Sequence, residues 1–315
     1  MVTLEQARNL AQDKLSTLII DEFRKDPLLD LMVFDDVVNP QGGTSLAYVY
    51  NRVTTYPTAD FRAIGEEYTP QEAQTTPITV HLKVFGGAFE IDRVIAKHYR
   101  GLVDHVTFQI QQKIEATKAL FADTFINGDS AVNAKAFDGL DKALTGTDTE
   151  ITPDAPIDLS TAEAIKANKE LLIYWLDQML SELNGQPSAL LVSRKAYAAI
   201  RTAATLLTQF TATKDNLGRT ILQYSDIPII VLGDKPGTTN PIIGADAEGN
   251  TSIYAVRIAL DGVHAVSPAG QLPVETYLPN FELPGAVKFG EVEMVTAIAL
   301  KATKAAGVLR GVKIQ

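Results

Sequence analysis

The chain contains 315 residues, of which 46% are hydrophobic, so it can bury a sizeable core and wholesale disorder is not expected. Its 28 basic and 38 acidic residues leave a net charge of −10, which argues against a general nucleic-acid-binding protein, because such proteins present a basic surface. Cysteine is absent, which excludes disulfide bonds, thiolate metal sites and a cysteine nucleophile. The sequence shows no secretory signal and no bilayer-spanning run, so we expect a soluble protein made in the cytoplasm.

The N-terminal part predicts a helix followed by an extended arm. Thr3 and Gln6 form a capping-box pattern, and apolar residues follow at helical spacing. The helix is expected to stop at Asp26-Pro27, because helical geometry is disfavoured for a residue that precedes proline. Residues 28–43 carry no periodic pattern and are expected to be irregular.

Two runs of alternating apolar and polar residues then predict a long antiparallel hairpin. The first run contains Ala47, Val49 and Val53, and the second extends from Ile78 to Val84. A proline-rich, charged connection separates them. With about eleven residues in each strand, the arms would be roughly 35–40 Å long.

The next segment predicts one unusually long helix. From Ile91 to Asn127, apolar residues recur at three- and four-residue steps without a proline. Such a helix would measure roughly 55 Å, about three times the usual length in globular proteins. The pair Asn127-Gly128 is expected to end it.

The second half of the chain predicts a mixed α/β unit followed by strands. A capping box at Ser160 and Glu163 begins a helix that should run to Asn184-Gly185. The other expected elements are a strand at 189–192, a helix at about 194–207, strands near 221–224, 227–232 and 252–258, a long strand from 292 to 301 and a final strand at 307–314.

Three stretches carry a resemblance to a known family. They are Phe-Ile-Asn-Gly-Asp at 125–129, Phe-Asp-Gly-Leu at 137–140, and the strand-rich tail from Glu275 to Lys304. With the order of arm, hairpin, long helix, α/β unit and returning strands, the chain resembles the major capsid proteins of tailed bacteriophages. Encapsulins share this fold.

The resemblance implies an α+β fold with five named parts. They are an N-terminal arm (1–43), an E-loop hairpin (44–90), a spine helix with part of the P domain (91–159), an A domain (160–268) and P-domain strands (269–315). It further implies a structural subunit that assembles into an icosahedral viral capsid around double-stranded DNA. Such a subunit is not an enzyme and needs no cofactor.

The partners that follow are copies of the chain itself, in hexamers and pentamers, with weak and non-specific contact to packaged DNA and none to a membrane. The expected location is the virion capsid, assembled in the host cytoplasm. Some family members cross-link an E-loop lysine to a neighbour, but Lys83, near the hairpin base, is the only candidate between 43 and 83, so we predict no cross-link. The short 1–43 arm favours a separate scaffolding protein, together with a portal.

A long isolated hairpin is marginal in water, so this one needs a surface to lie on. A sister subunit can supply that surface. We predict that Tyr56, Phe61 and Arg62, near the hairpin tip, contact the neighbouring copy, because aromatic and arginine side chains dominate interface energetics.

Residues that could carry chemistry form no convincing site. Of the four histidines, His98 and His105 share a helix face but not the spacing of a metal pair, and His81 and His264 stand apart. Segment 244–252 faintly resembles a calcium loop but is better explained as a turn. The pairs Asp35-Asp36 and Tyr174-Trp175 are expected to be solvated and packed, respectively. We therefore predict no catalytic, cofactor or metal residues.

Two alternatives remain open from the sequence. An encapsulin shell enclosing a protein cargo has the same order of elements, and the particle's contents would distinguish it. A soluble α/β enzyme is the remote alternative, and it would require a convergent polar site.

Overall fold

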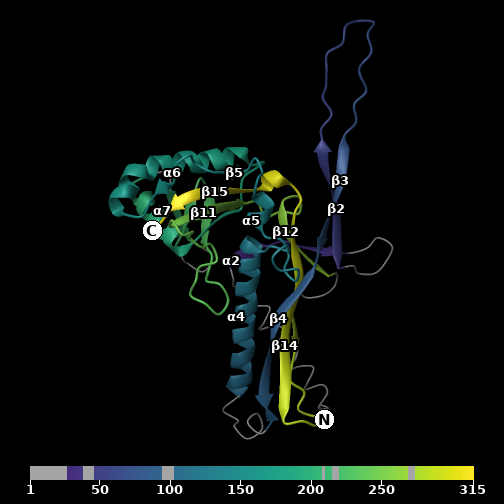
Figure 1. Ribbon diagram of the computed structural model, residues 1–315, viewed down its shortest axis with the longest axis vertical. Coiled ribbons are helices and arrows are strands. Elements are labelled where there is room, and N and C mark those ends of the chain that lie inside the picture. The colour runs from purple at the N-terminus through teal and green to yellow at the C-terminus, as the bar shows by residue number, and fades with distance from the viewer. Residues whose placement is uncertain (1–26, 38–45, 94–102, 208–209, 215–219, 269–273) are drawn as a thin grey trace.

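The computed structural model describes residues 27–37, 46–93, 103–207, 210–214, 220–268 and 274–315. The helix expected between Thr3 and Pro27 lies outside them. Figure 1 shows a helix-covered body, a long helix with a β-ribbon beside it, and a hairpin that projects away from both. No helix in these ranges is long and apolar enough to cross a bilayer.

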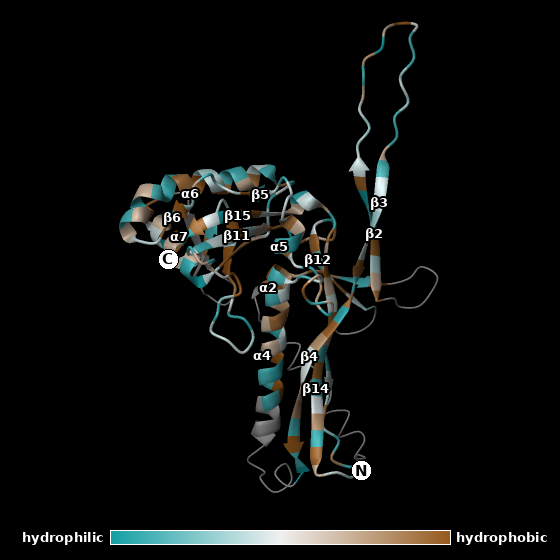
Figure 2. Cartoon of the chain, in the orientation of Figure 1, coloured by the Kyte–Doolittle hydropathy of each residue, from teal (hydrophilic) through white to brown (hydrophobic). Residues whose placement is uncertain are grey.

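Strand β14 (Val287–Leu300) organises the elongated part of the molecule. It pairs antiparallel with β4 (Lys83–Asp92) on one side and with β13 (Val274–Tyr277) and β12 (Val263–Pro268) on the other. Glutamate and apolar residues alternate over 291–294, and the strand becomes mostly apolar toward Leu300 (Figure 2). Helix α4 (Val103–Asn127) covers the buried face and supplies core side chains from Ile110 to Phe125.

The long helix is shorter at its start than the sequence pattern predicted. Ile91 is the penultimate residue of β4 and pairs with Lys288 of β14, so the prediction of a helix from Ile91 is wrong there. Phe89 and Ile91 are buried while Glu90 between them is exposed, which is a strand period that the wider helical spacing obscured. The 25 described residues of α4 give a length of about 37 Å. The predicted end at Asn127 is confirmed.

The predicted hairpin is present but ends earlier than expected. Strands β2 (Ala47–Thr55) and β3 (Gln74–His81) pair antiparallel, and Gly65 makes the far turn with a positive φ of 96°. The expected second arm breaks at Leu82, after which β4 leaves to pair with β14. We call residues 46–82 the finger. Residues 83–90, which we had grouped with it, belong to the ribbon.

The segment expected to be an irregular arm contains regular structure. Helix α2 (Pro27–Leu31) precedes strand β1 (Phe34–Val37), which pairs in parallel with β12. Four residues carry little sequence signal for a strand, and their partner lies more than 200 positions away in the chain. This correction matters because β1 places Asp35 beside the finger.

The second sheet has the order β5-β15-β11-β7-β10-β9-β8, with β6 also on β15. Its strands are β5 (Glu150–Ile151), β6 (Ile157–Asp158), β7 (Ala189–Val192), β8 (Phe210–Lys214), β9 (Thr220–Tyr224), β10 (Ile227–Val231), β11 (Asn250–Val256) and β15 (Ala306–Lys313). Helices α6 (Ala162–Glu182) and α7 (Arg194–Thr205) pack against it. The sequence predicted these elements apart from β5, β6 and β8.

Two strands lie in a different sheet from the one expected for their part of the chain. Strand β15 was expected with the returning strands, but it is inserted between β5 and β11. Residues 263–268 were expected within the α/β unit without a predicted strand, but they form β12, which pairs with β14. The N-cap of α6 is Thr161 rather than Ser160, since the Thr161 hydroxyl accepts the Ala164 N–H at 3.1 Å.

Adjacent glycines in β4 provide a matched test of the ribbon. A Cβ on Gly86 would lie 1.9 Å from the Val292 carbonyl oxygen, whereas one on Gly87 would meet only the flexible Lys113 side chain at 3.1 Å. We expect Gly86→Ala to lower the free energy of unfolding by about 1–3 kcal/mol through overpacking. Gly87→Ala should change it by less than about 0.5 kcal/mol. Urea denaturation of both variants checks this, and equal losses would contradict the close strand approach.

Candidate functional site: the finger and its base

The tip of the finger exposes aromatic and apolar side chains to solvent. Phe61 and Ile64 are fully exposed, at 107% and 105%, and Tyr56 is 77% exposed. Residues 56–73 contain four carboxylates and one arginine, which gives this segment a charge of 1 − 4 = −3. Its own body therefore leaves the tip uncovered (Figure 1).

The three residues predicted for contact between copies all lie on this distal segment. Tyr56 and Phe61 are free of the body, as expected. Arg62 donates to the Glu66 carbonyl at 3.0 Å and its guanidinium carbon stands 5.3 Å from the centre of the Tyr68 ring. The contact itself stays a prediction.

The base of the finger is fastened to the end of β14 by polar contacts. Tyr50 donates its hydroxyl to the Leu300 carbonyl at 2.8 Å. Arg52 donates through Nε to the Lys301 carbonyl at 3.0 Å and through Nη2 to the Leu300 carbonyl. Because β2 alternates, Tyr48, Tyr50 and Arg52 share the face that meets the body, while Val49 and Val53 face solvent.

Tyr48 joins a second cluster at the same place. Its hydroxyl donates to Asp35 Oδ2 at 2.6 Å, and Lys301 Nζ lies 3.6 Å from the same oxygen. The ring of His264 meets the Tyr48 ring edge-on with centroids 5.7 Å apart. Four elements, β1, β2, β12 and the end of β14, therefore converge on the finger base.

The contacts within this cluster shift the pKa values of Asp35 and Tyr48 in opposite directions. Burial by itself raises the pKa of Asp35, but the Tyr48 hydroxyl, the Asp36 N–H and Lys301 outweigh it and leave the pKa below its ordinary value. Burial and the hydrogen bond to Asp35 raise the pKa of Tyr48. Asp35 is thus an ionised acceptor rather than the solvated acid that the sequence predicted.

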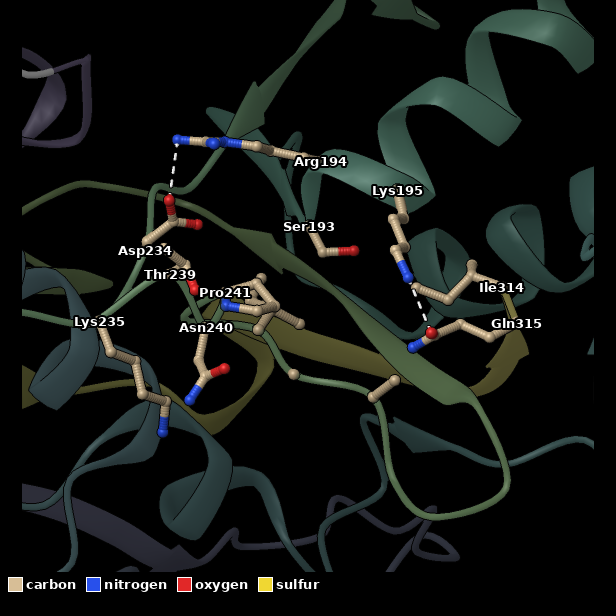
Figure 3. A pocket seen from close by; sticks show the side chains of 13 residues that line it. Ser193, Arg194, Lys195, Asp234, Lys235, Thr239, Asn240, Pro241, Ile314 and Gln315 are labelled. Carbon is tan, nitrogen blue, oxygen red and sulfur yellow. Dashed lines mark hydrogen bonds and ion pairs between the residues drawn. The ribbon is translucent and has the colours of Figure 1, made fainter.

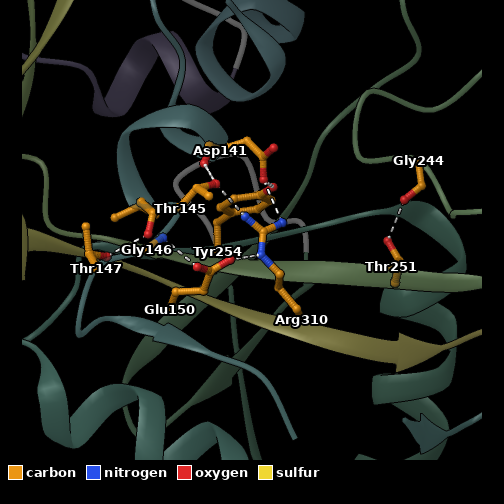
Figure 4. A network of polar contacts seen from close by, with 10 residues as sticks. Asp141, Thr145, Gly146, Thr147, Glu150, Gly244, Thr251, Tyr254 and Arg310 are labelled. Atoms are coloured by element: carbon orange, nitrogen blue, oxygen red, sulfur yellow. Dashed lines mark hydrogen bonds and ion pairs between the residues drawn. The ribbon is translucent and has the colours of Figure 1, made fainter.

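A second polar network joins strands β5, β11 and β15 of the second sheet to the segment after α4 (Figure 4). Arg310 of β15 donates to Asp141 at 2.8 Å and pairs with Glu150, and Tyr254 of β11 also donates to Asp141 at 2.8 Å. Asp141 lies on α5 (Leu140–Leu144). Because the partners are up to 169 residues apart, this network could not be predicted from local sequence patterns.

Gly128 and Gly139, which lie in the stretches that resemble the phage capsid family, leave no room for a side chain. Gly139 N–H donates to the Gly128 carbonyl at 2.8 Å, where the chain crosses itself after α4. A Cβ on Gly128 would lie 2.3 Å from the Phe137 carbonyl oxygen, and one on Gly139 would lie 2.6 Å from that of Ile126. This close crossing positions Phe137 against Phe121 in the core.

A pocket of about 500 Å³ lies where β7 and β10 end, at the start of α7 (Figure 3). Its basic side chains do not converge. Arg194 pairs with Asp234 at 3.3 Å, Lys195 donates to the Gln315 side chain at 2.7 Å, and Lys235 pairs with Asp123 at 3.5 Å. With its cations engaged by neighbours, the pocket offers no assembled catalytic arrangement.

The other candidate residues are placed as follows. No cluster of potential metal ligands occurs within the described ranges, and His98 lies outside them. His81 is exposed on β3. The Asp246 carboxylate accepts the Glu248 and Asn250 N–H groups at 2.9 and 2.8 Å, which confirms a turn in segment 244–252.

The comparisons with known proteins agree with this geometry. No family model and no curated protein matches the sequence. A solved encapsulin, the holo-SrpI complex from Synechococcus elongatus, matches with a TM-score of 0.63 at 16% identity, covering 91% of this chain and 87% of that one. The capsid of a native GTA particle matches with a TM-score of 0.55 at 12% identity and coverages of 90% and 89%. Mycobacterium phage Bobi gives 0.55 at 13% identity, also with coverages of 90% and 89%.

These matches extend over nine-tenths of the chain. At such low identity they establish the fold and nothing finer. The α+β, tailed-phage major capsid fold predicted from the sequence, which encapsulins share, is therefore confirmed.

The finger base yields a prediction about Arg52. Lysine at this position cannot reproduce the guanidinium fork across two carbonyls. We expect Arg52→Lys to weaken closure of the base by about 1–3 kcal/mol, which would accelerate amide hydrogen exchange in residues 47–55 by about fivefold to 150-fold. Arg62→Lys at the tip is the matched control and should leave that exchange unchanged. Equal exchange rates in residues 47–55 of both variants would show that the Arg52 contacts do not hold the finger base closed.

Proposed function

We propose that this chain is the structural subunit of an icosahedral viral capsid that encloses double-stranded DNA and that it catalyses no reaction. The observation that carries the proposal is the projecting finger, whose aromatic tip lies beyond the reach of its own body in a fold shared with shell-forming proteins. Exposed apolar groups of this size mark interaction surfaces in soluble proteins. A neighbouring copy of the same chain is the partner that a shell supplies.

The parts of the chain take the following roles in the proposal. The finger serves as the E-loop and lies over the next subunit. The ribbon of β4 and β14, with α4, serves as the P domain, and the sheet carrying α6 and α7 serves as the A domain, which surrounds the axes of pentamers and hexamers. Virions assembled in the host cytoplasm are the expected location, with a separate scaffolding protein and a portal as partners.

Cohesion between subunits is non-covalent in this proposal. Lys83 is the only lysine in the sequence from 44 to 90, and its ammonium group donates to the Ala134 carbonyl of the same chain at 2.8 Å. It sits at the start of β4, far from the tip, and is poorly placed to reach a neighbour. Buried surface must therefore overcome the repulsion between copies that each carry a net charge of −10.

The tip residues provide the first test. Replacing Tyr56, Phe61 and Arg62 together with alanine should leave the monomer folded, because none of the three contributes to a core. Shell yield should fall by at least about tenfold, since loss of two aromatic anchors and an arginine removes more than about 1.4 kcal/mol per contact. Electron microscopy and sedimentation measure the yield.

A control variant separates a specific contact from a general loss of apolar surface. Val132 and Leu260 are 86% and 50% exposed outside the finger, and replacing both with alanine should leave shells intact. Shells that form normally from the triple variant would contradict the assignment of the tip.

An encapsulin-type shell is the second candidate, favoured by the TM-score of 0.63 to an encapsulin. The two candidates differ in what the particle holds. We expect particles purified from the native source to carry nuclease-protected double-stranded DNA, measured by absorbance ratio and sequencing after nuclease treatment. Particles that instead contain one stoichiometric protein and no nucleic acid would establish the encapsulin candidate.

A further inference from the structure

His264 occupies an unusual position at the finger base. The residue is fully buried on β12, and neither ring nitrogen makes a hydrogen bond of normal geometry with the described residues, although the backbone of Gly262 lies close enough to favour the protonated ring. Buried polar groups are nearly always paired, so an unpaired imidazole calls for an explanation. The ring lies against Tyr48, the residue that ties the finger to Asp35.

The groups that face the ring come from three other elements. Asp35 of β1 places Oδ2 3.8 Å from His264 Nε2, which is too long for a hydrogen bond. That oxygen already accepts from Tyr48 of β2, and Lys301, after β14, lies 3.6 Å from it. Beyond them, Arg52 is bound to the Lys301 carbonyl. The Asp35 carboxylate is therefore already engaged by the Lys301 ammonium and the Tyr48 hydroxyl while the imidazole is neutral.

We propose that Asp35, Tyr48, His264 and Lys301 form an acid-sensitive latch, which holds the finger base against the end of β14 while His264 is neutral and releases it when the ring binds a proton. The neutral ring packs edge-on against Tyr48 and carries no charge that water would have to solvate. An imidazolium in the same place would be a buried cation next to the Lys301 ammonium, with its one carboxylate already shared. Release exposes the ring to water, where the charge is solvated.

The direction of the pH dependence follows from the same arrangement. Burial lowers the pKa of His264 and Lys301 lowers it further, while Asp35 and the backbone of Gly262 oppose these effects only in part. In the open form the imidazole has its ordinary pKa of about 6.5. The open form therefore binds the proton more tightly than the closed form. The latch is fully closed above that pH and weakens as the pH falls below it.

Hydrogen exchange on the full-length, unassembled chain tests the latch. Rates for residues 47–55 and 74–81, corrected for the intrinsic effect of pH, are compared at about pH 7.5 and about pH 5.5. One pH unit below the ordinary imidazole pKa allows opening to rise by up to about tenfold. Residues 162–182 of α6, remote from the cluster, should show no such rise. An unchanged or slower exchange at the lower pH, as expected if the imidazolium pairs with Asp35, would overturn the proposal.

Variants identify the group that titrates. His264→Phe keeps a ring against Tyr48 and should abolish the pH-dependent rise, whereas His81→Gln, on the exposed face of the same finger, should retain it. A rise that persists in His264→Phe refutes the role of His264. If that variant fails to fold by circular dichroism, Lys301→Gln decides the question. Removing the neighbouring ammonium should shrink the rise, and a rise of undiminished size counts against the latch.

Discussion

The end of strand β14 is the constraint on which the rest of the molecule depends. Along its length β14 pairs with β4, β13 and β12. The carbonyls of its last residue, Leu300, and of the next residue, Lys301, accept hydrogen bonds from the finger. A strand inside a sheet has its backbone groups satisfied by neighbours, but where pairing stops these groups are open to side chains. Tyr50 and Arg52 use that opening. The finger can therefore extend into solvent without a core of its own.

Much of the architecture could be predicted from local pattern because local physics decides it. The alternation in β14 reflects one face packed on α4, and Val292 and Met294 are fully buried as their spacing requires. The C-terminal end of α4 follows the Asn127-Gly128 signal, and strand β7 and the start of α7 lie where the local pattern placed them. The order of elements was enough to indicate the fold, even though no family model matches the sequence.

The errors arose where distant parts of the chain decide the outcome. Ile91 fits a helical spacing and a strand spacing equally well, and only pairing with Lys288 makes it a strand residue. Strand β1 exists because β12 lies beside it, and the same pairing converts Asp35 from an expected surface acid into the partner of Tyr48. No sequence rule links residues 35, 48, 264 and 301. The polar contacts at the finger base therefore could not be predicted from the sequence, whereas the exposed tip could be.

In the capsid that we propose, the contrast between base and tip would let a modest chain form a large assembly. The base is fixed by short hydrogen bonds within one subunit, so the direction of the finger is set before any partner arrives. Such preorganisation reduces the ordering cost of association. The tip carries acidic residues and uncovered rings, so each contact in the proposed shell would be weak and opposed by charge, and it would become stable only when each subunit both gives and receives a finger around a closed ring. Weak contacts of this kind would let wrongly placed subunits dissociate, whereas a covalent link through Lys83 would prevent their release.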